Sequence, residues 1–204
     1  MDNERESVMR IYLVGVSCVG KSTIGKILAD KLSYNFADFD LEIPRRMGES
    51  IKTIQSRNFN GYGFREEVSH ILSEILEENK DHVVIAMPPS GMYGQYLRVL
   101  KKNPDVLTIT IKDKAKNILE RLVFYDDDNE YLIQNVVNDN NRQHYYQEIK
   151  EDIEYFYTTH RKTKMKFNIA GRNAEESAEV LFFEIREKYM DEKQINRRGS
   201  LIEP

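Results

Sequence analysis

The sequence contains one cysteine, Cys18, no tryptophan and five prolines among its 204 residues. A single cysteine excludes a disulfide within the chain and is typical of a reducing compartment. No hydrophobic run is long enough to span a bilayer, and the first ten residues, MDNERESVMR, lack the apolar stretch of a secretory signal. We therefore expect a cytoplasmic protein with no membrane partner.

Strong charge of either sign is also missing. The 30 basic and 34 acidic residues give a net charge of -4 and are mixed along the chain. There is no basic stripe of the kind that binds nucleic acid, so we expect no nucleic-acid partner. The length suits one compact domain, and 40% hydrophobic residues suffice for a packed core. We expect a monomer with a flexible segment 1–9, a single domain over 10–189 and a disordered tail over 190–204.

Short apolar runs alternate with amphipathic segments along the chain. The runs predict five strands, near residues 11–15, 34–40, 82–87, 106–111 and 165–170. The segments between and after them predict helices over 21–32, 43–58 with a break at Gly48, 63–79, 94–103, 113–124, about 130–160, and 173–189 with Asn173 as its cap. This alternation predicts an α/β fold, a five-stranded parallel sheet flanked by helices.

The stretch GVSCVGKST, residues 15–23, follows the first predicted strand and opens the first helix. Its first eight residues fit G-x-x-x-x-G-K-S, the phosphate-loop (P-loop) pattern. The glycines let main-chain N–H groups turn toward phosphate oxygens, Lys21 reaches the outer phosphates, and Ser22 can ligate Mg²⁺. The chain has no N/T-K-x-D guanine-reading pattern, which favours ATP. We expect nucleotide contacts from Gly15, Val16, Ser17, Cys18, Val19, Gly20, Lys21, Ser22 and Thr23.

Two acids, Asp38 and Asp40, end the second predicted strand. Ligands of a parallel sheet bind beyond the carboxyl ends of the strands. In extended chain the i, i+2 spacing would point both side chains the same way. One carboxylate could then serve the metal shell while the other orients or deprotonates an acceptor hydroxyl. The alternative is a pair of turn acids without a chemical role.

The order of these motifs resembles the shikimate kinase family of small P-loop kinases. After the phosphate loop come FADFDLEI (36–43), GESI (48–51) and FREE (64–67), similar to that family's F-x-D-x-D-x-x-I-E, G-x-S-I and F-R-x-x-E. The match is good over about residues 10–80 and thinner afterwards. The resemblance implies a P-loop kinase fold with a small lid at about 124–140, ATP and Mg²⁺ as cofactors, and phosphorylation of a hydroxyl on a small acidic metabolite. Shikimate is the leading acceptor.

The resemblance also implies roles for the residues around the phosphate loop. Lys21 and Asp40 would be catalytic, with Asp40 in contact with the acceptor hydroxyl as the candidate base. Asp38 would serve Mg²⁺ together with Ser22.

Four arginines are implied in ligand binding by the same resemblance. Arg65 and Arg142 would hold the acceptor's carboxylate, which a planar guanidinium binds bidentately. Arg121 would contact adenine, and Arg172, in a turn similar to the family's base loop, is a weaker candidate for the same role. For each of the four, the alternative is a solvated surface charge.

The chain departs from the family pattern on the acceptor and lid side. Pro88, Pro89 and Ser90 stand where the family has three glycines. Proline has no N–H to donate, which leaves Ser90 and Gly91 as candidates for the acceptor contact. The count to the family's lid arginine lands on Asp128, and NGYGFR (60–65) lacks the glutamate of G-E-x-x-F-R. ATP binding is therefore the firmer expectation. The alternatives are a kinase for another hydroxylated acid such as gluconate, or a nucleotide-binding degenerate kinase with little catalysis.

Overall fold

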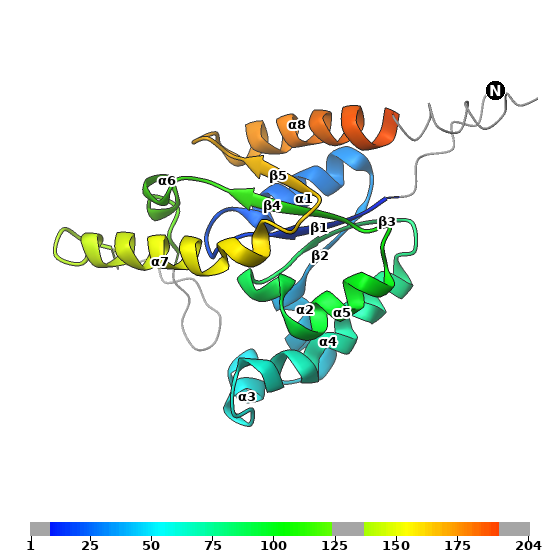
Figure 1. Ribbon diagram of the computed structural model, residues 1–204, viewed down its shortest axis with the longest axis horizontal. Helices are drawn as coiled ribbons and strands as arrows, with labels where there is room; N and C mark the ends of the chain where they lie inside the picture. The colour runs from blue at the N-terminus through cyan, green and yellow to red at the C-terminus, as the bar shows by residue number, and fades with distance from the viewer. Residues whose placement is uncertain (1–8, 124–136, 192–204) are drawn as a thin grey trace, which may run out of the picture.

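The computed structural model describes residues 9–123 and 137–191 (Figure 1). Its centre is an all-parallel five-stranded sheet with the strand order β2-β3-β1-β4-β5. The strands are β1 Met9–Val14, β2 Asn35–Asp38, β3 His82–Ala86, β4 Leu107–Lys112 and β5 Met165–Asn168. Each lies within or beside one of the five predicted runs, so the α/β class and the parallel sheet are confirmed.

β1 is the middle strand, with β3 on one side and β4 on the other. Leu13 pairs in register with Ala86 of β3 and with Ile109 of β4. All six residues of β1 are buried, which explains its unbroken apolar run, because a strand inside a parallel sheet is covered on both faces. β1 begins at Met9, so the flexible segment expected over 1–9 is one residue too long at that end.

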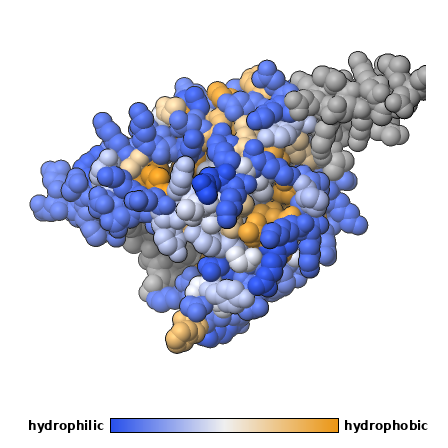
Figure 2. Space-filling view, viewed as in Figure 1, coloured by the Kyte–Doolittle hydropathy of each residue, from blue (hydrophilic) through white to orange (hydrophobic). Residues whose placement is uncertain are grey.

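Helices cover both faces of the sheet (Figure 1). On one face lie α1 Lys21–Leu32 and α8 Ala174–Ile185, which share a core with β1, β4 and β5. On the other face lie α2 Phe39–Met47, α3 Ile51–Ser56, α4 Gly61–Glu78 and α5 Gly94–Lys102, which share a second core. α7 Arg142–His160 runs alongside the β4–β5 half of the molecule. The surface in Figure 2 is mostly hydrophilic, as expected when the apolar residues fill these two cores.

The helix expected over 113–124 is shorter in the structure, where α6 spans Ala115–Leu119. After it, the N–H groups of Arg121 and Leu122 bond to carbonyls three residues back, those of Ile118 and Leu119. Such bonds tighten and end an α-helix. A turn of 3-10 helix, η1 Pro89–Met92, and a π-helical turn, η2 Arg186–Asp191, complete the described elements.

Asn173 caps α8 as the sequence predicts. Its side-chain oxygen accepts from the N–H of Glu176 at 2.8 Å, and the Glu176 carboxylate accepts from the N–H of Asn173 at 3.2 Å. This reciprocal capping box satisfies two N–H groups that the helix itself leaves free. Within 9–123 and 137–191, no helix is both long enough and apolar enough to cross a membrane. The tail predicted over 190–204 lies almost wholly outside the described residues.

Replacing Gly15 with alanine should destabilise the fold. An added Cβ would lie 2.4 Å from the carbonyl oxygen of Ile111 and 2.9 Å from Val19 Cγ1. Because a strand carbonyl cannot move aside, we expect the free energy of unfolding in urea to fall by about 3 kcal/mol.

Gly48→Ala is the matched control. Gly48 has a φ of +69° and no atom within 4 Å of an added Cβ, so only backbone strain opposes the change. We expect a loss of about 1 kcal/mol there. Equal losses at the two glycines would contradict the close approach of Gly15 to β4.

Candidate active site

The candidate active site is a pocket of about 720 Å³ at the carboxyl edge of the sheet. It gathers segments that are far apart in the sequence, because parallel strands deliver their following loops to the same edge. Its described walls are Ser17, Cys18, Val19, Gly20, Lys21, Ser22, Thr23, Ile24, Asp38, Asp40, Ala86, Met87, Pro89, Arg121, Val123, Ile169, Arg172, Asn173 and Ala174.

The phosphate loop forms one side of this pocket. Gly20 has a φ of +108° and is the N-cap of α1, with no side-chain cap bond. The first N–H groups of the helix therefore keep their capacity to bind an anion, and the helix adds the positive end of its dipole. Lys21 Nζ donates to the carbonyl oxygen of Val16 at 2.9 Å, so the side chain folds back over the loop. Seven of the nine predicted contact residues line the pocket, and Gly15 and Val16 are not among its described walls.

Asp38 and Asp40 both line the pocket, but their local structure differs from the prediction. Asp38 is the last residue of β2 and the N-cap of α2, where its Oδ1 accepts from the N–H of Asp40 at 3.1 Å. Asp40 therefore sits in the first turn of a helix, and the extended-chain reason for their common direction was wrong. The strand ends here because the side-chain oxygen of Asp38 accepts a hydrogen bond from the N–H group of Asp40 and so caps the helix.

The lysine and the acid have pKa values shifted toward each other. Burial lowers the pKa of Lys21 to about 8, against the opposing charges of Asp40, Cys18 and Asp38. Asp40 is open to the mouth of the pocket, yet the protein around it displaces enough water to raise its pKa to about 6. The charge of Asp38 adds to that rise, and Lys21 opposes it. Groups poised near neutral pH are characteristic of functional sites.

Arg65, the fifth residue of α4, does not line the pocket itself. Its guanidinium is 5.9 Å from the ring centroid of Tyr93, and its Nε is buried with no hydrogen-bond partner. Among the described ion pairs it has no partner. The charge of Asp40 raises the pKa of buried Tyr96 and that of Arg65 lowers it, so both charges act on the same ring. A guanidinium without an acid beside it is available to a ligand carboxylate.

Three further predicted acceptor residues, Arg142, Ser90 and Gly91, do not line the pocket. Arg142 begins α7, is exposed and forms an ion pair with Glu120, away from Arg65. Ser90 and Gly91 are absent from the described walls of the pocket. Gly91 is already bonded at both main-chain groups, since its N–H donates to Pro88 at 2.9 Å and its carbonyl accepts from the Tyr12 hydroxyl at 2.6 Å. Their roles toward the acceptor stay predictions.

Arg121 and Arg172 line the pocket together, as expected for a pair that flanks one ligand. Arg121 forms an ion pair of 2.6 Å with the fully buried carboxylate of Asp113. Arg172 donates to the carbonyl of Asn168 at 2.6 Å and lies 5.5 Å from the ring centroid of Phe167. These contacts hold each flat guanidinium in place, and in both residues Nε is buried and leaves a donor unused.

Several pocket residues were missed by the sequence analysis. Met87 and Pro89 follow β3, and Val123 follows α6. Ile169 and Ala174 bracket the turn before α8. The position of each at or near the end of a predicted strand or helix was the available signal, but their apolar side chains suggested no chemistry.

A triphosphate and a metal ion fit the residues that are present. The described residues contain no group of three or more His, Cys, Asp or Glu side chains that could hold a metal by themselves. Mg²⁺, however, commonly takes only one or two protein oxygens and completes its shell with phosphate and water. The hydroxyl of Ser22 and the carboxylate of Asp38 supply such oxygens within the pocket.

A parallel sheet of this order, with a phosphate loop after the middle strand and two acids at the next strand end, defines a P-loop phosphotransferase. A sequence model of the shikimate kinase family matches residues 17–186. The chain belongs to the shikimate kinase family, so it is an ATP-dependent kinase that phosphorylates an alcohol group.

Individual relatives agree with this assignment. Shikimate kinase of Persephonella marina is 34% identical over 116 residues, which cover 54% of this chain and 70% of the relative. The crystal structure of shikimate kinase from Aquifex aeolicus is 28% identical with a TM-score of 0.62, covering 88% of this chain and 99% of that one. The enzyme from Acinetobacter baumannii, solved with shikimate, shares the fold at 24% identity and a TM-score of 0.66, covering 90% and 97%.

ATP affinity should depend on pH through Lys21. An ammonium group binds phosphate only when protonated, and the pKa of this lysine in the free protein is about 8 instead of 10.5. Affinity should be full below that pH and fall above it, by up to about tenfold per pH unit. Calorimetric titration of ATP between about pH 7 and pH 9 measures this.

Lys21→Met should weaken ATP binding and remove the fall in ATP affinity at alkaline pH. Lys26 is an exposed lysine of the same helix, and Lys26→Met should leave both the affinity and its pH dependence unchanged. A wild-type affinity that stays constant across this range would contradict the assignment of Lys21 to the phosphates.

Proposed function

We propose that this protein transfers the γ-phosphoryl group of ATP to a hydroxyl of shikimate, with Mg²⁺ as cofactor. The observation that carries the proposal is one pocket in which a phosphate loop with Lys21 faces Asp40, with an unpaired Arg65 close by. The Acinetobacter baumannii enzyme, which shares this fold, was solved with shikimate bound.

On the nucleotide side, the loop N–H groups and Lys21 hold the β- and γ-phosphates. Ser22 and Asp38 would hold Mg²⁺, which neutralises phosphate charge when bound. Arg121 and Arg172 lie together at the far wall, where their planar guanidinium groups can flank adenine. Catalysis in such a site comes mainly from positioning and from charge.

On the acceptor side, Asp40 orients the hydroxyl and takes its proton. The hydroxyl oxygen forms a bond to the γ-phosphorus as the bond to the ADP oxygen breaks, and the proton passes to the carboxylate. A pKa of about 6 leaves Asp40 ionised at neutral pH, yet makes it a stronger base than an ordinary aspartate.

The acceptor's carboxylate binds Arg65. Arg142 remains a prediction as the second arginine, because here it pairs with Glu120. Both members of that pair are about half exposed, with side chains 45% and 55% accessible. An exposed ion pair contributes only about 0–1 kcal/mol, so a ligand carboxylate could displace Glu120 at little cost. Most of the lid expected over 124–140, Asp128 included, lies outside the described residues.

The test is ADP release by the purified protein with Mg²⁺ and ATP, with and without shikimate. We expect an acceptor-dependent rate whose kcat/KM falls about tenfold per pH unit below about pH 6, because Asp40 must be ionised to accept the proton. ATP binding without acceptor-dependent turnover would instead support the degenerate nucleotide-binding alternative.

Asp40→Asn should lower kcat by about 10²–10⁴-fold and abolish the acid limb of the profile. Asp30→Asn, an exposed acid in α1, is the control and should leave rate and profile unchanged. If the Asp40→Asn variant keeps the same acid limb, the limb belongs to another group and Asp40 is not the base.

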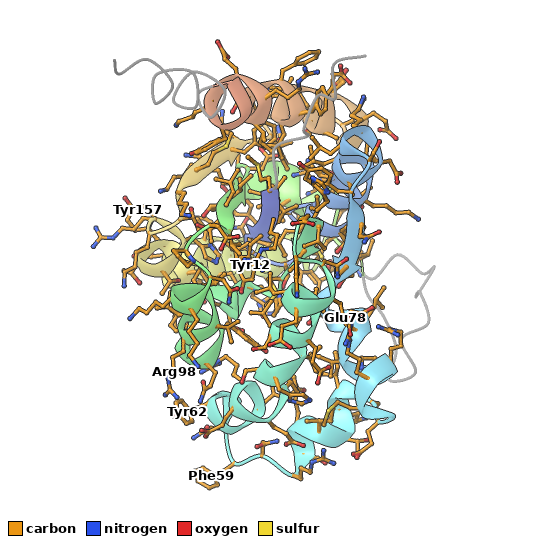
Figure 3. The ribbon with its side chains drawn as sticks, turned by 90° about the vertical axis from the view of Figure 1, so that its right-hand side faces the viewer. Tyr12, Phe59, Tyr62, Glu78, Arg98 and Tyr157 are labelled. Atoms are coloured by element: carbon orange, nitrogen blue, oxygen red, sulfur yellow. The ribbon has the colours of Figure 1, made fainter. Side chains whose placement is uncertain are left out.

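Arg65→Ala should raise KM for shikimate by about 10–100-fold, because a charged hydrogen-bond partner is lost, while KM for ATP stays within about twofold. Arg98→Ala is the matched control, since Arg98 is an exposed arginine of α5 that bonds only to the Tyr62 hydroxyl, at 3.2 Å, among the described contacts (Figure 3). Equal rises in the two KM values of the Arg65 variant would indicate a general disturbance of the site.

A further inference from the structure

The segment that follows β3 has few main-chain groups to offer a ligand. Pro88 and Pro89 have no N–H, and the N–H of Gly91 is used by the Pro88 carbonyl. The N–H of Tyr93 is used in the same way by the Ser90 carbonyl, at 2.9 Å. This segment, residues 87–93, therefore borders the pocket as a wall with few free main-chain donors. Met87 and Pro89 are among the described lining residues.

Two side chains from distant parts of the chain hold this wall. Tyr12, in the middle of the sheet (Figure 3), donates its hydroxyl to the Gly91 carbonyl at 2.6 Å. His160, the last residue of α7, contacts the Pro89 carbonyl through Nε2 at 2.9 Å. Because a carbonyl oxygen can only accept, Nε2 carries the proton.

His160 is itself fixed firmly. It is 7% exposed, and its ring stacks on that of Phe156 with centroids 5.4 Å apart and planes 12° from parallel. Its carbonyl accepts from the hydroxyl of Thr110 in β4 at 2.7 Å and from that of Thr163 at 2.9 Å. Burial lowers the pKa of His160, so the ring is neutral at neutral pH and its single N–H is committed to Pro89.

The ring of His160 also links Pro89 to Arg65, the two parts of the acceptor side. Phe156 meets Tyr93 edge to face with centroids 6.0 Å apart, and Tyr93 lies 5.9 Å from the Arg65 guanidinium. His160 thus contacts the wall at Pro89 directly and reaches Arg65 through two aromatic rings. None of these hydrogen bonds and ring contacts includes the phosphate loop or the two adenine-side arginines, although the charge of Lys21 adds to the effect of burial in lowering the pKa of His160.

We propose that His160 is a positioning residue for the acceptor: its Nε2–H fixes Pro89, so that the wall after β3 and Arg65 keep the spacing that the acceptor requires. This inference rests on the proposed function only in taking the pocket beside Pro89 and Arg65 as the acceptor's place. It predicts that the wall selects the acceptor by shape, because Pro88 and Pro89 offer it no N–H.

The test compares His160→Gln with His160→Met. Gln places an N–H donor close to the position of Nε2, whereas Met has nearly the same length and no donor. We expect His160→Met to raise KM for shikimate about fivefold to tenfold, with kcat and KM for ATP within about twofold of wild type. His160→Gln should restore KM to within about twofold of wild type.

Hydrogen–deuterium exchange of residues 87–93 supplies a readout that does not need turnover. Exchange at Gly91 and Tyr93 should rise at least about fivefold in the Met variant and stay near the wild-type rate in the Gln variant. His70→Met is the control, since His70 is an exposed histidine that also contacts a main-chain carbonyl, that of Glu67, at 2.8 Å. It should change neither exchange nor kinetics.

The outcomes separate this inference from the proposed function. If wild type shows no shikimate-dependent ADP release, the proposed function fails, and the exchange data still decide whether His160 holds the wall. Unchanged exchange in His160→Met would overturn the inference. So would equal rises in both KM values in the Met and Gln variants, because a purely structural role would affect both substrates and would not be rescued by a donor.

Discussion

The site depends on the hydrogen-bonded register of β1 between β3 and β4. Leu13 pairs with both Ala86, the last residue of β3, and Ile109, whereas β4 continues to Lys112 beside the loop that follows β1. Gly15 then turns so close to the Ile111 carbonyl that no side chain could be accommodated. The phosphate loop and the wall after β3 are therefore fixed to each other through main-chain bonds, which side-chain changes at the surface cannot shift.

The site contains charged groups whose burial is only partly offset by hydrogen bonds and ion pairs within the protein. Burial acts on Lys21 and Asp40 in opposite directions, since it disfavours the charged form of each. Three guanidinium groups, those of Arg65, Arg121 and Arg172, each keep a buried Nε without a partner. An unmet buried donor costs about 1–3 kcal/mol. A ligand carboxylate at Arg65 would offset part of that cost, and ligand phosphates would do the same for the buried charge of Lys21.

The features predicted best from the sequence are those set by neighbouring residues. The strands, the phosphate loop and the Asn173 cap each depend on a few consecutive side chains, and the structure contains all of them. One error of the sequence analysis is local: Asp38 caps α2 by accepting from the N–H of Asp40, two residues on, where extended chain was predicted. Distant contacts were out of its reach. Arg142 pairs with Glu120, 22 residues away, and the carbonyl of Gly91 accepts from the hydroxyl of Tyr12, 79 residues away. No local pattern contains these two pairings.

The two prolines after β3 give this segment a fixed backbone with few N–H donors, since proline restricts φ and has no N–H. A stiff wall is useful only if it is held at the right place, and that needs anchors from outside the segment. α7 supplies one of them: its 19 residues span about 28 Å, from the Glu120 ion pair at Arg142 to the Pro89 contact at His160. One helix thereby links the position of Pro89 to that of Glu120.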